Sequence, residues 1–492
     1  MRPPLTVANP ETIAYLRALV DDETDYQADM QQARQYDAGQ QFVALTDRLR
    51  TFLGGNASES AADWKRLRLN ICRIVLSAVV DKLIVHGFDS DEPARTVVAP
   101  DGTPQTVKPV AAWAWRLWQL NRMDAKQRRV HKMTLRDSEA FVLVDWDLTT
   151  GRPRFTPHQR YIDASVGGDS DGCRAFYRND DPDQDLLFVS KRWTEVIYAA
   201  GRRQTRRRLT VYYPDRIEKY AGVIGAEKPT VDADNEPWPI PWRHADGTPL
   251  GIPAVHFRSS AGMEARDAWP IQNAINKAFV DLMAESDMAA FRILLAFGWT
   301  PVDRNGNPLA IEPGTWLGSE KPGATVQEIA GADLSQFMNV IEGFMFWAAT
   351  VTDTPASRFI TTKAVAAEGT QKEQGAPLLN KARNRAGELG DAWENVLSIA
   401  RRLQNTFGTG PALDETPQLS AVWAPLEVRD KKAELEQAVI RKALGMPIRL
   451  VAKGLDLTQD EISAWVAEVE RRASVAAAAF GGDAQPQGDA AV

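Results

Sequence analysis

The sequence predicts an α+β fold, because strand-like segments in the middle of the chain are preceded and followed by helical segments. Between residues 141 and 220, apolar and polar residues alternate with period two, in short runs separated by turn-forming Gly and Asp. On either side of this block, apolar residues recur at steps of three and four, the period of an amphipathic helix. We therefore expect an antiparallel sheet region flanked in the chain by helices.

The composition excludes several classes of protein. The 492 residues are 44% hydrophobic, which is enough to bury large cores in about three folding units. A formal net charge of −7 argues against a general DNA binder, which would carry a net basic surface. Cys72 and Cys173 lack the spacing of metal ligands, and no apolar run approaches the ~20 residues of a membrane span. We expect no cofactor, no metal and no membrane contact.

The first half of the chain predicts helices followed by strands. Helices are expected over residues 63–83, 110–121 and 125–137, and Gly87 is expected to end the first of them. The residues between 89 and 108 are expected to form a polar connector. Strands are expected at residues 141–147, 155–161, 174–177, 187–198 and 209–220.

The second half is mainly helical, with one interruption. A helix is expected to begin near Ala268, and a second amphipathic helix follows Asp333, which has the side chain of an N-cap. Between them, residues 297–329 repeat Gly and Pro and contain Asn305-Gly306, so they predict a small hairpin-rich module.

A longer helix is expected over residues 378–407, with a kink or a fresh start near Gly375 and Pro377. A short strand at residues 419–423 and a further helical unit from residue 428 should follow. The Ala- and Gly-rich tail, residues 476–492, is expected to be disordered.

Two motifs point to catalysis, and both have a simpler interpretation. Gly168 to Gly172 match the G-x-S-x-G pattern around a hydrolase nucleophile, here Ser170, but that motif needs a helix after it and the sequence predicts a strand. Asp145 and Asp147 share one side of a strand, as in a metal-dependent nuclease, yet no third acid or lysine is placed to support them. A Gly/Asp-rich turn and a strand with solvated acids are favoured, so we do not expect an enzyme.

One dense basic cluster lies around Gly201, at the tip of a predicted hairpin. It contains Arg202, Arg203, Arg206, Arg207 and Arg208. A solvated turn is the default interpretation of such a run. Contact with phosphate or with an acidic neighbouring subunit is the alternative.

Several short motifs, taken in order, carry a resemblance to a known family. They are residues 70–88, 118–124 (WQLNRMD), 138–147 (SEAFVLVDWD), 252–257 (IPAVHF), 271–277 (IQNAINK), 364–403 and 432–451. Their order and spacing are similar to those of the portal proteins of tailed bacteriophages, in particular the siphophage type of phages that infect actinobacteria. The resemblance covers most of the chain.

This resemblance implies a portal fold with named parts. The wing would be residues 1–265, with N-terminal helices and then the antiparallel sheet, and the long kinked wing helix with a wing strand would be residues 364–425. The stem would consist of two helices, residues 266–292 and 333–352, with the clip at 293–332 between them. The tunnel loop would be residues 353–363, the α-helical crown 426–475, and the tail 476–492.

The resemblance also implies a function and partners. Portal proteins form a dodecameric ring at one capsid vertex of the virion, and double-stranded DNA passes through it during packaging and ejection. The implied partners are further copies of the chain, the major capsid protein, the terminase large subunit and the head-tail adaptor, after synthesis in the host cytoplasm. The channel is expected to be lined by Asp281, Glu285, Glu342, Arg358 and Lys363, and Trp299 and Trp316 are expected at the clip interface. A head-tail adaptor or minor capsid protein is the structural alternative, and a nuclease or serine hydrolase the enzymatic one.

Overall fold

The computed structural model divides the chain into two compact units. The first contains residues 1–34, 76–264 and 376–492, and the second contains residues 35–75 and 265–375. The residues that the structure describes are 24–41, 69–98, 104–169, 171–199, 201–221, 230–232, 238–290, 293–298, 302, 322–329, 333–359, 368–426, 431–446, 450–451, 462–463, 465–469 and 471–472.

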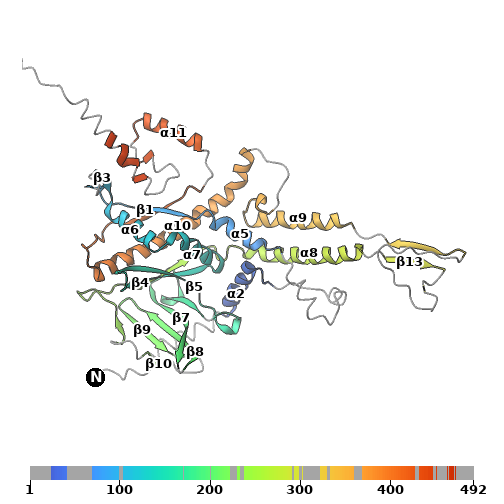
Figure 1. Cartoon of the computed structure of the whole chain (residues 1–492), viewed down its shortest axis with the longest axis horizontal. Coiled ribbons are helices and arrows are strands. Elements are labelled where there is room, and N and C mark those ends of the chain that lie inside the picture. The colour runs from blue at the N-terminus through green and yellow to red at the C-terminus, as the bar shows by residue number, and fades with distance from the viewer. Residues whose placement is uncertain are drawn as a thin grey trace, which may run out of the picture. The chain divides into compact units, whose positions relative to one another are not determined.

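The structure mixes helices with several small sheets, which confirms the predicted α+β class (Figure 1). The helices with residues in both units are α2 (Thr24–Ala38), α5 (Ile71–Val80) and α10 (Glu368–Phe407). The first unit also holds α6 (Pro109–Leu120), α7 (Met123–Asp137) and α11 (Lys431–Ala443). No helix in the described part of the chain is long and apolar enough to cross a bilayer.

The sheets of the first unit are antiparallel, as alternation predicted. One has the order β12-β4-β5 and another the order β10-β9-β8-β7-β6, with β11 also paired to β9. Shorter pairs join β1 to β15 and β2 to β3. Their bounds are β1 (Val85–Ser90), β2 (Arg95–Val98), β3 (Pro104–Val107), β4 (Glu139–Asp147), β5 (Arg152–Gln159), β6 (Gly172–Tyr177), β7 (Leu186–Ala199), β8 (Arg202–Tyr212), β9 (Arg216–Ala221), β10 (Thr230–Val231), β11 (Ile240–Pro241), β12 (Ala254–Arg258) and β15 (Leu419–Trp423).

The main core of the first unit lies where α6, α7 and α10 pack on β4 and β5 (Figure 1). Trp393 of α10 is fully buried there, with its ring centroid 4.8 Å from that of Trp118 and 4.7 Å from that of Phe257. Both neighbours meet it edge-on, a preferred aromatic geometry. The contact between Trp118 and Trp393 therefore joins two residues that are 275 positions apart in the chain.

A buried histidine ties this core together. Trp393 Nε1–H donates a hydrogen bond of 2.9 Å to His131 Nε2, and His131 Nδ1 lies 3.1 Å from the carbonyl oxygen of Leu83. Because Nε2 accepts, Nδ1 carries the proton and donates it to Leu83. Burial lowers the pKa of His131 to about 4, against the opposing effect of the bond to Leu83.

The first unit is therefore expected to lose stability in mild acid. The unfolded chain takes up a proton at His131 below about pH 6.5, whereas the folded chain does so only near pH 4. The stabilisation is complete above the unfolded pKa and is lost as the pH falls, by about 2 kcal/mol between about pH 7 and pH 5. Urea titrations of the wild type and of His131→Gln, followed by circular dichroism at several pH values, measure the free energy of unfolding. This free energy should depend less on pH in the variant than in the wild type. Equal slopes would contradict this assignment.

The second unit contains a helix pair and a hairpin. Its elements are α8 (Trp269–Ala290), β13 (Ile293–Phe297), β14 (Thr325–Ile329) and α9 (Leu334–Val351). Asp333 caps α9 as predicted, because its carboxylate accepts a 2.9 Å hydrogen bond from Ser335 N. At the start of α8, Trp269 stacks on Tyr36 with a centroid separation of 5.2 Å.

Some sequence predictions of local structure are wrong. The helix expected to end at Gly87 ends at Val80, and Gly87 lies inside β1, paired with Val422. The connector between residues 89 and 108 contains β2 and β3. The strand expected over residues 209–220 is two strands, because Pro214 and Asp215 form a turn between them. A 2.9 Å hydrogen bond from Tyr213 N to the carbonyl oxygen of Arg216 closes this turn.

The long helix differs as well, since α10 begins at Glu368 and continues through Pro377, so no fresh start occurs there. The predicted Asn305-Gly306 turn and the tail, residues 476–492, lie outside the described residues.

Candidate functional site

The α8–α9 pair of the second unit is the most informative surface. The two helices contact each other, and each has buried apolar side chains, among them Ile275 and Ala278 of α8 and Ile341 and Ala348 of α9. The start of α8 is held by Gln272, whose Oε1 accepts a 2.7 Å hydrogen bond from Ile71 N. The burial of Ile341 and Ala348 identifies the covered side of α9.

A second side of α9 is apolar but uncovered within the second unit. Val340, Phe344, Trp347 and Val351 follow one another at steps of four, three and four, so they line one side of the helix. Val340, Trp347 and Val351 are 50%, 59% and 52% exposed, and Phe344 is half-buried. We call these four residues the α9 stripe. A helix that is apolar on more than one side is normally buried on more than one side.

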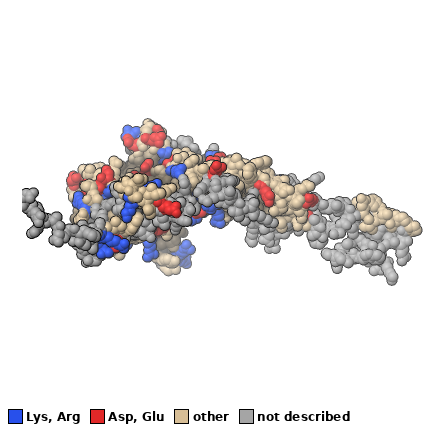
Figure 2. Space-filling model, turned by 90° about the horizontal axis from the view of Figure 1, so that it is seen from above, with Lys and Arg blue, Asp and Glu red and all other residues tan. Residues whose placement is uncertain are grey.

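A third side of α9 is mainly polar. It contains Ser335, Asn339, Glu342, Phe346 and Thr350, all of them exposed. Glu342 is the only charged residue between Leu334 and Val351. Figure 2 shows few charged atoms along the part of the second unit that holds the helix pair. The apolar stripe and the polar row lie next to each other on the same helix.

The other predicted channel residues have different settings. Asp281 of α8 forms an ion pair of 2.6 Å with Lys277, which relieves the repulsion expected between Asp281 and Glu285. Glu285 is half-buried, and Arg358 is exposed on the 3-10 turn Ala356–Arg358. Lys363 and the two predicted clip residues, Trp299 and Trp316, lie outside the residues that the structure describes.

The basic cluster is divided by the structure. Arg208 is bound by two carboxylates, Glu195 at 2.7 Å and Asp232. The other four arginines belong to the free end of the β7–β8 hairpin, and within the described residues none of them forms an ion pair with an acidic side chain. They are Arg202, Arg203, Arg206 and Arg207.

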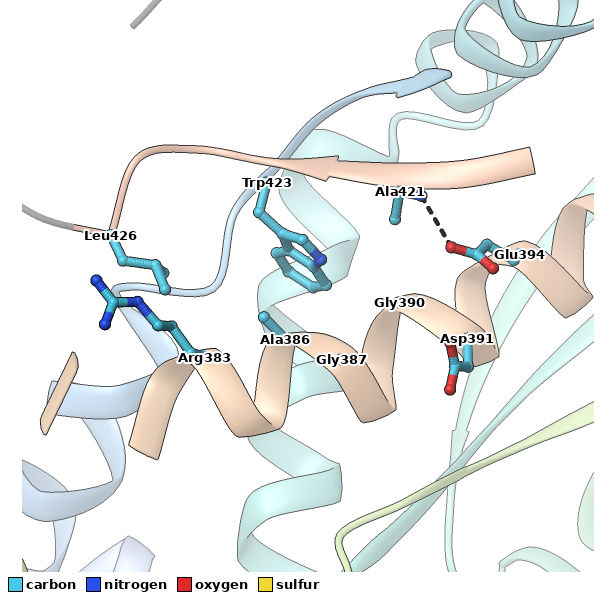
Figure 3. Close-up of a pocket in the computed structure, with 9 residues that line it drawn as sticks. All are labelled: Arg383, Ala386, Gly387, Gly390, Asp391, Glu394, Ala421, Trp423 and Leu426. Carbon is cyan, nitrogen blue, oxygen red and sulfur yellow. Dashed lines mark hydrogen bonds between the residues drawn. The ribbon is translucent and has the colours of Figure 1, made fainter. Parts of the chain in front are cut away.

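A shallow groove of about 350 Å³ lies between α10 and β15 of the first unit (Figure 3). Trp423 faces the helix beside Gly390, where a side chain would meet the indole at 3.4 Å. Glu394 accepts a 3.0 Å hydrogen bond from Ala421 N, and burial raises its pKa. This carboxyl group holds the strand on the helix.

A buried polar network also lies in the first unit. Glu139 contacts Arg160 at 3.5 Å and His256 at 2.9 Å, and His256 in turn contacts the Tyr177 hydroxyl at 2.9 Å. Burial opposes ionisation of Glu139, but Arg160 and His256 outweigh it and lower its pKa to about 2. Burial also raises the pKa of Tyr177 to about 12, which makes the hydroxyl a weak nucleophile. The network connects β4, β6 and β12.

Neither of the two catalytic motifs is supported by the residues that the structure describes. Ser170 lies outside the described residues, and β6 begins at Gly172, where a nucleophile elbow requires a helix. In the register of β4 and β5, Asp145 and Asp147 lie opposite Arg154 and Arg152. In the parts of the chain with described placement, no three His, Cys, Asp or Glu side chains form a group that could hold a metal ion.

The α9 stripe was missed in the sequence, although a signal was present. The sequence predicted one amphipathic helix after Asp333 and no second apolar side, whereas Val340 and Trp347 are 50% and 59% exposed. The signal lies in the low charge of the helix, since one charged residue in 18 leaves apolar residues on most of its sides.

The fold and the uncovered α9 stripe are typical of a subunit of a larger assembly. The sequence agrees with this class, because the family described as "Phage portal protein, SPP1 Gp6-like" matches residues 105–474. The chain therefore belongs to the phage portal proteins of the SPP1 Gp6-like family. This family is structural rather than enzymatic. No curated protein matches the sequence.

Proposed function

We propose that this chain forms the dodecameric portal ring of a siphophage-type tailed phage, at one vertex of the capsid. Genomic double-stranded DNA passes through the ring during packaging and ejection. The ring contacts the major capsid protein and docks first the terminase large subunit and then the head-tail adaptor. One observation carries this proposal, namely the uncovered α9 stripe in a member of the portal family.

The two sides of α9 support a specific arrangement in the ring. The α9 stripe is covered by a neighbouring copy, because burying its apolar area is favourable and a closed ring provides the same contact to every subunit. The adjacent row with Glu342 then faces the water-filled channel. Negative charge there repels DNA phosphates, so DNA slides without being held.

The parts of the portal fold are assigned as expected from the sequence. We place the wing at residues 1–265 with the helix and strand at 364–425, and the stem at 266–292 and 333–352. The clip is placed at 293–332, the tunnel loop at 353–363 and the crown at 426–475. The stem assignment is supported by α8 and α9, and the clip assignment by the β13–β14 hairpin.

Electron microscopy of the purified chain tests the ring directly. Negatively stained particles should be rings with a central hole, and native mass spectrometry should give the mass of a dodecamer. A monodisperse monomer in several buffers would overturn the proposal. A head-tail adaptor or minor capsid protein remains the alternative, and it would bind preformed portal rings instead of forming them.

Reversing the charge of Glu342 is expected to slow DNA packaging several-fold. A ring carries one copy of Glu342 in every subunit, so Glu342→Lys replaces a repulsive band with an attractive one. Packaging of DNA into procapsids that contain the variant measures the effect. Glu342→Gln is the control and should be nearly neutral. Normal packaging by intact Glu342→Lys rings would contradict a channel position.

A further inference from the structure

The free end of the β7–β8 hairpin is a basic surface on an acidic chain. Residues 191–208 contain seven basic residues and one acidic residue, whereas the whole chain has a net charge of −7. The acidic residue is Glu195, and it is bound to Arg208 at 2.7 Å. The positive charge of the hairpin end is therefore not neutralised by Glu195.

The hairpin end extends beyond the neighbouring strands of its sheet. β6 pairs with β7 up to Arg192, and β9 pairs with β8 from Arg208 onward. Residues 193–199 and 202–207 therefore form a two-stranded ribbon, and no described strand pairs with its outer edges. We call these residues the arginine ribbon.

Arginines occupy both faces of the arginine ribbon. Side chains alternate along a strand, so Arg202 and Arg206 lie on one face and Arg203 and Arg207 on the other. On the second face, Arg203 is paired with Tyr198, which is 79% exposed. The two arginines on each face are about 13 Å apart along the strand.

We propose that the arginine ribbon binds double-stranded DNA through its phosphates, independently of sequence. A two-stranded ribbon fits the DNA major groove, which is about 12 Å wide and has phosphates on both walls. Guanidinium groups on both faces suit that ligand, because each face meets one wall. An acidic protein surface would engage only one face. The proposal adds to the proposed function a second contact with DNA, made by residues of the first unit.

Arginines on a ribbon edge have another use, since charge prevents edge-to-edge aggregation. That use requires only solvated charge and predicts no affinity for DNA. The two interpretations are separated by measuring binding. Fluorescence anisotropy of a short labelled duplex, titrated with the full-length chain at several salt concentrations, gives both the affinity and its salt dependence.

The test variant replaces Arg202, Arg203, Arg206 and Arg207 with glutamine. Its affinity at low salt is expected to fall roughly 10- to 100-fold, and the slope of log K against log salt to fall by about 3 to 4. The matched control replaces four exposed arginines elsewhere, Arg73, Arg116, Arg129 and Arg154, and changes the net charge by the same amount. The control should retain most of the affinity.

Four outcomes would overturn the proposal. They are absence of binding by the wild type, equal loss in the test and control variants, equal competition by single-stranded DNA, and displacement by polyglutamate as efficient as by duplex. If the fourfold variant fails to fold, Arg202→Gln/Arg206→Gln and Arg203→Gln/Arg207→Gln are measured separately, and each should lose about half of the slope. Ring formation, imaged in the same samples, shows whether the proposed function holds independently.

Discussion

Replacing Trp393 with alanine is expected to lower the free energy of unfolding of the first unit by about 4 kcal/mol. Trp393 is fully buried between Trp118 and Phe257, and its indole N–H satisfies His131. Truncation leaves a large cavity and a buried ring nitrogen without its donor. The measurement is a urea titration followed by far-ultraviolet circular dichroism, in which the midpoint should fall strongly.

Trp393→Phe separates packing from hydrogen bonding. Phenylalanine keeps an aromatic ring against Trp118 and Phe257 but cannot donate to His131, so the expected cost is about 1–2 kcal/mol. If the phenylalanine and alanine variants lose the same free energy of unfolding, the packing of the ring does not contribute to stability. The alanine variant should also lose most of the acid sensitivity assigned to His131, because an opened core lets its imidazole be hydrated.

Much of the fold could be predicted because its signals are local. Alternation placed β4 and β7 close to their observed bounds, and Asp333 marked the start of α9 from a side chain that caps its own helix. The errors involve distant partners. β1 pairs with β15, more than 300 residues later, and no local pattern around Gly87 reveals that partner. Long-range pairing is set by packing, which periodicity does not report.

The candidate site was less predictable than the fold. The resemblance to portal proteins suggested acidic residues as channel candidates, but the sequence could not show that Asp281 forms an ion pair with Lys277. Five arginines formed a single cluster in the sequence, and only the strand register separates Arg208 from the free ribbon end. The exposure of an apolar side chain depends on which residues of the folded unit pack against it. The sequence alone therefore could not distinguish the exposed Trp347 from a buried tryptophan.

Placing two charges on the α9 stripe is expected to prevent ring formation. In Val340→Asp/Trp347→Asp, each subunit would bury two carboxylates against its neighbour, at a cost of several kcal/mol per contact. Since every contact in a ring is identical, the cost is paid at all of them and the ring does not close. Negative-stain images and native mass spectrometry should show monomers. Their circular dichroism should be unchanged, because Val340 and Trp347 are 50% and 59% exposed in the single chain.

A control on the same helix decides what such a result means. Asn339→Asp/Thr350→Asp adds two carboxylates to the polar row of α9, where both residues are exposed. The helix, the added charge and the residue type introduced are the same, so any general effect of negative charge on α9 appears in both variants. Rings in the control and monomers in the stripe variant identify the α9 stripe as the subunit contact and leave the Glu342 side facing water. Monomers in both would instead show a general effect of negative charge on α9, and the α9 stripe would then not be identified as the subunit contact.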